Sequence, residues 1–467
     1  MNYEMDAAAE GRLISYFDQI GMVLGNKKRR ESFAVYAVGL LSDAERKSVE
    51  PLAARACADP ERANPEHQKL LHFVGESEWS DHAVRRAATQ YALAAIGQRE
   101  SVGAWIIDDT GFLKQGRHSV GVQRQYTGSA GKITNCQIGV SLTFATPSTH
   151  LPVDFELYLP ETWANDASKR RAGGIPKDVV FRTKPELALA MIRRALLDGL
   201  PRGLVLADAA YGNSSAFRAA LRAEGLDYAV GIEGNTKVWP VGVRRGQPKS
   251  VHDLALAIGI QRYRRVTWRH GSKKPLWSWF ATCRVIPCHD DGTAIDEREE
   301  LWLLIEWPPD EGEPTKYTLS TLPKRTSRQD LARLTKERWR TERIYEDLKG
   351  ELGLDHFEGR RFRGWHHHVS VALCCYAFVA AEQARSFSPS AARSGRARTQ
   401  RGPSRAPFRG FVHHHAARDH ATDLTMAPEV PSLPSAASAS RRTSCVVADS
   451  YGIGLIRIGG GTGMQGA

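Results

Sequence analysis

Cysteine is scarce in this sequence and follows no metal-binding pattern. Seven cysteines are scattered over 467 residues, their number is odd, and no pair of CxxC units occurs. A structural zinc site requires paired spacings of that kind, and a disulfide framework uses an even number of cysteines. The cysteine pattern therefore excludes both classes and favours a reducing compartment.

Long apolar runs are also missing. The longest nearly apolar run, Val369 to Ala381, is too short to cross a bilayer. The opening residues, MNYEMDAAAEGR, are acidic and lack the apolar core of a secretion signal. We therefore expect a cytoplasmic protein with no membrane partner.

Lysine is absent from Arg385 onward, where Arg, Ala, Ser, Pro and Gly dominate. This segment holds eleven Arg and four acidic residues, so it contributes +7 of the formal net charge of +12. The composition predicts a disordered tail over 386–467; a frame-shifted end is the alternative. The overall pI of about 9.4 points to a polyanionic partner, but most of this charge lies outside the expected folded part.

The rest of the chain divides by its hydrophobic periodicity into four regions. Helical spacing dominates 1–98, a candidate DNA-recognition region, and strands alternate with helices over 99–233. Strand-like segments separated by turns fill 234–330, which predicts a β-rich insertion. Helical spacing then resumes over 331–385. Together these patterns predict an α/β protein whose core is interrupted by an all-β insertion.

Two apolar runs in the core end in acidic residues. GAWIIDD ends at Asp108 and Asp109, and RGLVLADAAYG reaches Asp208. Buried strands of this kind place the residues at their carboxyl ends at the edge of a sheet. The order of three strands, helix, strand, helix and strand is typical of the ribonuclease H-like fold, a mixed sheet flanked by helices. In that fold the first and fourth strands are neighbours, so two acids would meet.

Local signals mark several helix ends and one loop. Ser42 with Glu45 forms a capping-box pattern that predicts a helix start. Thr183 with Glu186 forms the same pattern before TKPELALAMIRRALLDG. The polar, glycine-containing stretch from 162 to 176 is expected to be a loop.

A third acid lies on a predicted helix, ERWRTERIYEDLKG. At helical spacing Arg338, Glu342, Tyr345 and Lys349 fall on one side. A carboxylate bracketed by a guanidinium and an ammonium suits a metal ion beside a phosphate. A surface ion pair is the ordinary alternative for such a glutamate. Glu346 lies one turn further on and stays open as a substitute for Glu342.

The three acids together predict a metal site. Asp108 or Asp109, Asp208 and Glu342 would repel one another unless a cation neutralised them. Oxygen ligands of this kind select Mg²⁺ or Mn²⁺. Two such ions roughly 3.5–4 Å apart can activate a water or a 3′ hydroxyl and stabilise the leaving oxygen of a phosphodiester.

Several blocks of the sequence resemble transposases of the DDE superfamily, in the IS701-like and IS4-like insertion-sequence group. The blocks are DDTGFLKQGRHSVGVQRQYTGSAGKITNCQIGVSLTFAT, PETWANDASKRRAGGIP, LADAAYGN and ERWRTERIYEDLKGELGLDHFEGRRFRGWHHHVSVALCCYAF. The resemblance implies that Asp108, Asp208 and Glu342 form the catalytic, metal-binding triad, with Asp108 favoured over Asp109. In the family signature Y-x2-R-x3-E-x6-K, Thr335 stands at the position of the Tyr.

The resemblance further implies cut-and-paste transposition by a nucleoid-associated homodimer on double-stranded DNA, both element ends and target. Arg338 and Lys349 match the signature and are expected to contact phosphate. Lys114 and Arg124, in a basic stretch after the first acid, are further candidates for DNA contact. A catalytically inactive DNA-binding descendant and a ribonuclease H-like nuclease without a role in transposition are the alternatives.

Overall fold

The computed structural model describes residues 7–57, 63–242, 247–270, 274–288 and 299–386. The predicted disordered tail lies outside these residues, apart from Ser386, which ends the last helix. None of the six cysteines in the described part is paired in a disulfide. No helix there has the length and apolar character needed to cross a membrane.

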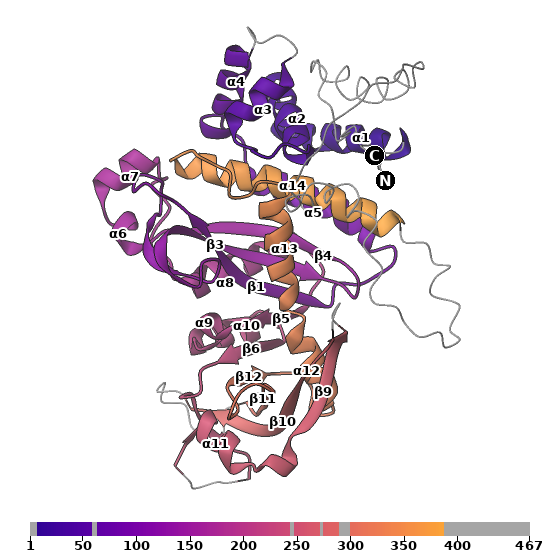
Figure 1. The fold of residues 1–467 in the computed structure, drawn as a ribbon, viewed down its shortest axis with the longest axis vertical. Coiled ribbons are helices and arrows are strands. Elements are labelled where there is room, and N and C mark those ends of the chain that lie inside the picture. Colours follow the sequence, from indigo (N-terminus) through magenta and orange to yellow (C-terminus); the bar gives the residue numbers. More distant parts are fainter. Residues whose placement is uncertain (1–6, 58–62, 243–246, 271–273, 289–298, 387–467) are drawn as a thin grey trace, which may run out of the picture.

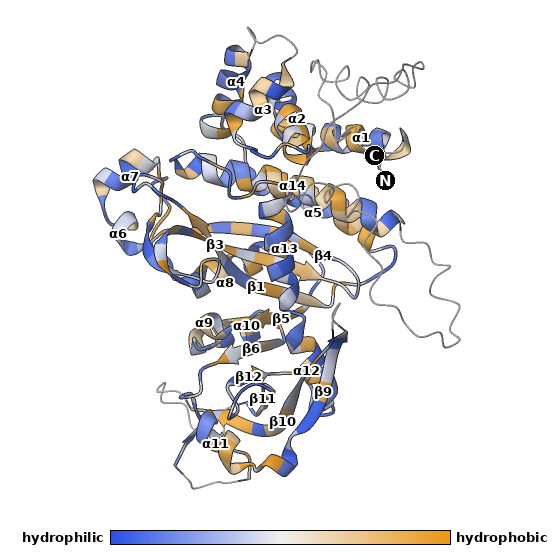
Figure 2. Ribbon diagram, viewed as in Figure 1, coloured by the Kyte–Doolittle hydropathy of each residue, from blue (hydrophilic) through white to orange (hydrophobic). Residues whose placement is uncertain are grey.

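Helices of the N-terminal region pack against the last helix of the chain, α14 (Phe362–Ser386) (Figure 1). The N-terminal helices are α1 (Ala7–Leu24), α2 (Lys27–Leu41), α3 (Val49–Ala56), α4 (Ala63–Gly75) and α5 (Asp81–Ile96), of which α3 packs on α2 and α4. Their buried side chains join those of α14 and of the central strands in one hydrophobic cluster. In Figure 2 the central strands show much apolar colour, whereas β9 is largely hydrophilic. The helical region thus shares its core with the rest of the protein.

Twelve strands of the described chain form one sheet in the order β2-β3-β1-β5-β6-β12-β11-β10-β7-β8, with β4 paired to β3 and β9 paired to β10. The core strands are β1 (Ala104–Leu113), β2 (Gln123–Thr127), β3 (Lys132–Ala145), β4 (His150–Tyr158), β5 (Leu204–Ala207) and β6 (Tyr228–Ile232). β1 pairs antiparallel with β3 and parallel with β5, and β5 pairs parallel with β6. This is the predicted mixed α/β core of a ribonuclease H-like protein, with its first and fourth expected strands, β1 and β5, side by side.

The β-rich region continues the core sheet through an antiparallel pair between β12 and β6. Its elements are β7 (Lys237–Pro240), β8 (Lys249–Ser250), α11 (Val251–Ala257), a 3-10 turn (Ile260–Arg262), β9 (Arg264–His270), β10 (Pro275–Pro287), β11 (Leu301–Trp307) and β12 (Lys316–Ser320). The strand-like patterns there were correctly interpreted. Hydrogen bonding of β12 to β6 makes the insertion an extension of the core sheet.

The remaining helices flank the sheet or follow it. They are α6 (Glu161–Ala164), α7 (Ala167–Gly173), α8 (Lys184–Leu197), α9 (Ala209–Gly212), α10 (Ser215–Ala223), α12 (Arg328–Lys336) and α13 (Trp339–Gly350). The long helical pattern before Gly350 is interrupted between α12 and α13, and Arg338 lies at this break. Figure 1 shows α13 crossing the strands of the core beneath α14.

Two local predictions were wrong and one is confirmed. Ser42 ends α2 instead of starting a helix, because its hydroxyl donates to the Gly39 carbonyl at 2.7 Å. The stretch from 162 to 176 contains α7 and most of α6, and the Asp166 side chain caps α7. The Thr183 capping box is present at the start of α8. Capping patterns alone do not say on which side of the residue the helix lies.

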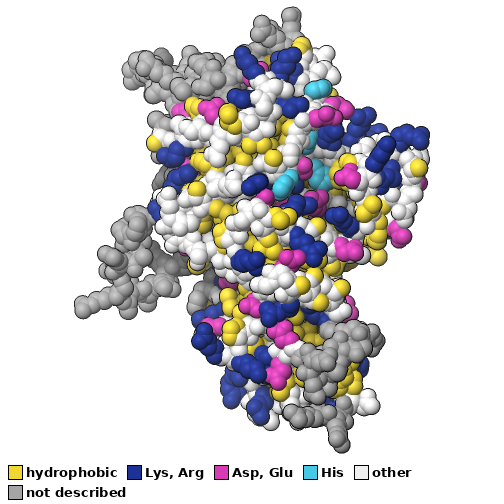
Figure 3. Space-filling model, turned by 180° about the vertical axis from the view of Figure 1, so that it is seen from behind, with side chains coloured by type: hydrophobic (Ala, Val, Ile, Leu, Met, Phe, Trp, Pro, Cys, Tyr) yellow, Lys and Arg dark blue, Asp and Glu magenta, His cyan; other side chains and the backbone are white. Residues whose placement is uncertain are grey.

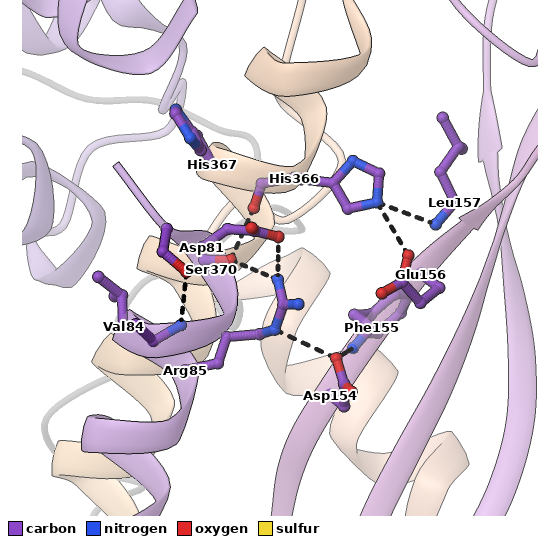
Figure 4. A network of polar contacts seen from close by, with 12 residues as sticks. Asp81, Val84, Arg85, Asp154, Phe155, Glu156, Leu157, His366, His367 and Ser370 are labelled. Carbon is purple, nitrogen blue, oxygen red and sulfur yellow. Dashed lines mark hydrogen bonds and ion pairs between the residues drawn. The ribbon is translucent and has the colours of Figure 1, made fainter. Parts of the chain in front are cut away.

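A buried ion-pair network joins the N-terminal helices to the core (Figure 4). Arg85 of α5 donates to Asp81 at 2.7 Å and to Ser370 of α14 at 2.8 Å, and it pairs with Asp154 of β4 at 3.2 Å. Arg194 of α8 pairs with the same Asp154 at 2.8 Å. Burial would raise the pKa of Asp81, but the Arg85 guanidinium holds it well below its usual range. The network fixes α5, α8 and α14 around β4.

Candidate active site

The parallel pairing of β1 and β5 brings two acids to one edge of the sheet. Ile106 lies opposite Leu206 in the register of these strands. Continued by two residues, the same register places Asp108, in the middle of β1, opposite Asp208, which directly follows β5. The prediction that Asp108 and Asp109 end a strand was wrong, because β1 continues along β3 to Leu113. Because neighbouring strands lie about 4.8 Å apart, the two carboxylates start from adjacent backbone positions. The predicted pairing of the first and fourth strands is thus confirmed, and a shared metal site of their acids stays a prediction.

Asp108 is a buried carboxylate with one dominant partner. Its side chain is 12% exposed, and its Oδ2 accepts a hydrogen bond from Nη1 of Arg338 at 2.6 Å. Burial raises the pKa of Asp108 to about 7, Arg338 opposes this shift, and the charge of Asp208 adds to it. The site therefore places a costly negative charge where a cation would be stabilised.

Asp208 combines a structural and a potential ligand role. It is the N-cap of α9, and its Oδ1 accepts from the Ala210 backbone N–H at 2.9 Å. The cap holds the carboxylate in one orientation. One oxygen is used by the helix, and the carboxylate retains acceptor capacity for a ligand.

Glu342 lies in the first turn of α13 with an exposed side chain. Its carboxylate makes no hydrogen bond or ion pair with the described residues. Burial would lower the pKa of Arg338, but the charges of Asp108, Asp208 and Glu342 together raise it. The Arg338 guanidinium therefore interacts electrostatically with all three predicted acids. Glu346 is also exposed, but it pairs with Arg343 at 3.1 Å.

The donor set fits a hard divalent cation in its chemistry. Asp108, Asp208 and Glu342 offer carboxylate oxygens, the ligands that Mg²⁺ and Mn²⁺ prefer. In the described part of the chain, however, no three acidic, His or Cys side chains lie close enough together to enclose a metal ion. The positive charge among the acids is that of Arg338, which binds Asp108.

Asp109 faces away from Asp108, as alternation along a strand requires. Its Oδ2 accepts from Nζ of Lys184 at 3.0 Å and from the hydroxyl of Tyr211 at 3.1 Å. Asp108 lies opposite Ser141 in β3, whereas Asp109 lies opposite Val140. The two contacts of Asp109 were not predicted. The pair of adjacent acids at a strand end was the only signal for them.

The predicted face of α13 is the one that contacts the core. Tyr345 and Ser141 share a hydrogen bond of 2.6 Å between their hydroxyls. Nζ of Lys349 donates to Thr110 at 2.8 Å and to the carbonyl of Gly111 at 2.7 Å. These contacts fix α13 across β1 and β3, next to Asp108.

The other predicted DNA contacts differ in accessibility. Nζ of Lys114 donates to the Phe357 carbonyl at 2.7 Å, and burial lowers the pKa of both Lys114 and Lys349. Arg124 on β2 is exposed. Thr335, at the signature position of the Tyr, donates to the Leu331 carbonyl of its own helix at 2.8 Å. On the back of the molecule, Lys and Arg are interspersed with Asp and Glu (Figure 3).

A ribonuclease H-like core with acids on β1, directly after β5 and on α13 is the layout of a polynucleotide-cleaving enzyme. Comparison with known families agrees, because residues 17–275 match the model described as DDE superfamily endonuclease. Residues 174–378 match the model of the transposase DDE domain. The chain belongs to the DDE superfamily of endonucleases and transposases.

A curated relative has the name "Probable transposase for insertion sequence element IS701" and comes from Microchaete diplosiphon. The two sequences are 31% identical over 206 residues, which cover 44% of this chain and 49% of the relative. This chain therefore matches about half the length of that protein.

Proposed function

We propose that this chain is a transposase that cleaves DNA at the ends of an insertion element and transfers the strands to target DNA. The observation that carries the proposal is the meeting of Asp108 and Asp208 on neighbouring strands, with both acids and Glu342 acting on the Arg338 guanidinium. Membership of the DDE superfamily and the similarity to a probable insertion-sequence transposase support it.

Asp108, Asp208 and Glu342 would hold Mg²⁺ or Mn²⁺, with two ions bound. Such ions, when bound, supply the Lewis acidity that activates a water or 3′ hydroxyl and stabilises the leaving oxygen. The chain supplies position and charge. β1 buries Asp108, the α9 cap orients Asp208, and α13 carries Glu342 in its first turn, where it would complete the set.

Four basic residues would contact the DNA backbone. Arg124 is already exposed for this role. In the structure the other three, Arg338, Lys349 and Lys114, donate hydrogen bonds to oxygens of the protein. A DNA phosphate oxygen would compete for the same donors. The working unit would be a homodimer that holds two DNA ends together.

The decisive experiment is cleavage of a supercoiled plasmid that carries the element ends, with Mg²⁺ and the full chain. Asp208→Asn keeps the helix cap but removes one anionic ligand. We expect it and Glu342→Gln to reduce cleavage by more than about a hundredfold, since even changes in residues behind metal ligands cost ten- to a hundredfold. Glu346→Gln is the matched control on the same helix and should cleave normally.

The products separate the proposal from its alternatives. Joined products with defined element ends support a transposase. Nicking without joining would instead indicate a nuclease. Binding of DNA without cleavage at any Mg²⁺ or Mn²⁺ concentration would indicate an inactive descendant.

A further inference from the structure

Asp109 connects three elements behind the proposed ion site. It lies on β1, it accepts from Tyr211 of α9 at 3.1 Å, and it pairs with Lys184 of α8 at 3.0 Å. Its side chain is 19% exposed and that of Lys184 is 28% exposed, so water screens the pair only in part. These contacts lie on the face of β1 opposite to Asp108.

The bond from Tyr211 to Asp109 joins the two segments that carry the proposed ligands. Asp109 directly follows Asp108, and Tyr211 lies on the single-turn helix that Asp208 caps. Tyr211 is fully buried. The hydrogen bond therefore closes a short loop of covalent and hydrogen bonds from one acid to the other. A change in the distance between the acids must strain or break this loop.

Tight packing leaves α9 little room to move relative to the sheet. A Cβ at Gly212 would lie 2.0 Å from the Gly231 carbonyl of β6, and a Cβ at Gly231 would lie 2.9 Å from the Ala209 backbone nitrogen. Only glycine permits so close an approach of two backbones. The Tyr211 ring is thus held by a helix that is itself fixed on β6.

Lys184 completes the arrangement from the other side. It is the first residue of α8, directly after the Thr183 capping box. Its charge neutralises Asp109, which would otherwise add a third negative charge beside Asp108 and Asp208.

We propose that Asp109, Tyr211 and Lys184 form a brace that sets the spacing of Asp108 and Asp208 and thereby the divalent-ion affinity of the site. They are positioning residues that act through the ligands. The inference rests on the proposed function for the presence of an ion site, and it adds the residues that tune this site. Residues that orient metal ligands from behind typically change metal affinity ten- to a hundredfold.

The test measures Ca²⁺ binding to the full chain by titration calorimetry, beside the Mg²⁺ dependence of plasmid cleavage. Tyr211→Phe removes one hydroxyl and keeps the ring. We expect its Ca²⁺ affinity to fall about tenfold and its cleavage to need about tenfold more Mg²⁺, with the maximal rate largely restored. Lys184→Met should likewise lower the Ca²⁺ affinity and raise the Mg²⁺ concentration that cleavage requires.

The matched control is Tyr263→Phe. Tyr263 is buried in the insertion, and its hydroxyl donates to the Ala255 carbonyl at 3.0 Å. This variant loses a similar bond far from the site and should bind Ca²⁺ as the wild type does. This control shows how much the loss of a buried hydroxyl changes Ca²⁺ binding and cleavage through lower stability alone.

The outcomes distinguish the brace from the proposed function. If the wild type cleaves and binds Ca²⁺ while Tyr211→Phe behaves like Tyr263→Phe, the brace is wrong and the proposed function stands. If Asp109→Asn abolishes cleavage at every Mg²⁺ concentration, Asp109 is itself a ligand and the brace is also wrong. A wild type that neither binds Ca²⁺ nor cleaves would overturn the proposed function itself.

Discussion

Arg338 and Asp108 form a hydrogen-bonded ion pair of 2.6 Å at the break between α12 and α13. The pair links the first strand of the core to the helix of Glu342, although the two residues are far apart in the sequence. It also places a guanidinium among the acids proposed to hold divalent ions. The Arg338 guanidinium and the divalent ions would therefore compete for the Asp108 carboxylate.

Replacing Arg338 by Gln tests this competition. Without the guanidinium, buried Asp108 loses its partner, and the free energy of unfolding without metal should fall on the order of 3 kcal/mol. Divalent ions should then stabilise the variant more than they stabilise the wild type. Urea unfolding in EDTA and in Ca²⁺ measures both effects. Arg343→Gln, also on α13, is the control, and an equal Ca²⁺ effect in all three proteins would contradict the interpretation.

Arg124 and Lys114 should separate DNA contact from structural support. Arg124→Ala removes an exposed charge, so it should lower DNA affinity and reduce the salt dependence of binding by about one unit of slope, without loss of stability. Lys114→Ala leaves the Phe357 carbonyl without its donor and should lower the free energy of unfolding by about 1–3 kcal/mol. DNA-binding isotherms at several salt concentrations test Arg124→Ala, and urea unfolding tests Lys114→Ala. An unchanged slope in Arg124→Ala would remove this residue from the DNA interface.

The Arg85 network should dominate the attachment of the N-terminal helices. Arg85→Met removes the Arg85 guanidinium from Asp81 and leaves Asp154 with Arg194 alone, and we expect a loss of about 3–5 kcal/mol in the free energy of unfolding. Arg193→Met is the control, because its pair with Glu224 is half-exposed and should contribute no more than about 1 kcal/mol. Chemical unfolding measures both, and equal losses would show that burial of the network adds nothing.

His368 should make the protein less stable in acid. Its Nδ1 bonds the Tyr36 hydroxyl at 2.8 Å and its Nε2 faces the Gly353 carbonyl at 3.0 Å, which suits the neutral ring. Burial lowers its pKa from 6.5 to about 4. Because the unfolded chain binds the proton first, the stabilisation is complete above pH 6.5 and is lost as the pH falls toward 4.

The loss in the free energy of unfolding that is due to His368 should reach about 2 kcal/mol by pH 5. Urea unfolding at pH 7.5 and pH 5 measures it. His368→Gln should be less stable at pH 7.5 but should lose less between the two pH values. An identical pH dependence in both proteins would assign the acid effect to other groups.

Local predictions from the sequence failed where one pattern fits two structures. Ser42 with Glu45 matches the pattern of a helix start, but Ser42 ends α2. The polar stretch from 162 to 176 was expected to be a loop, but it contains α7 and most of α6. Short helices of this kind depend on packing against neighbours more than on propensity. Thr183 was predicted correctly because an amphipathic helix and a Pro follow its capping box.

Sequence patterns alone were enough to predict the α/β core, the strand-like insertion, the acids that follow two apolar runs and the helical face that bears Glu342. These features follow from periodicity and residue type, which are local properties. The folded structure alone shows that β1 continues past its two acids, that Arg338 stands among the acids, and that Asp109 turns to Tyr211 and Lys184. Such contacts join residues far apart in the chain, and strand pairing and close backbone packing, which no local pattern encodes, bring them together.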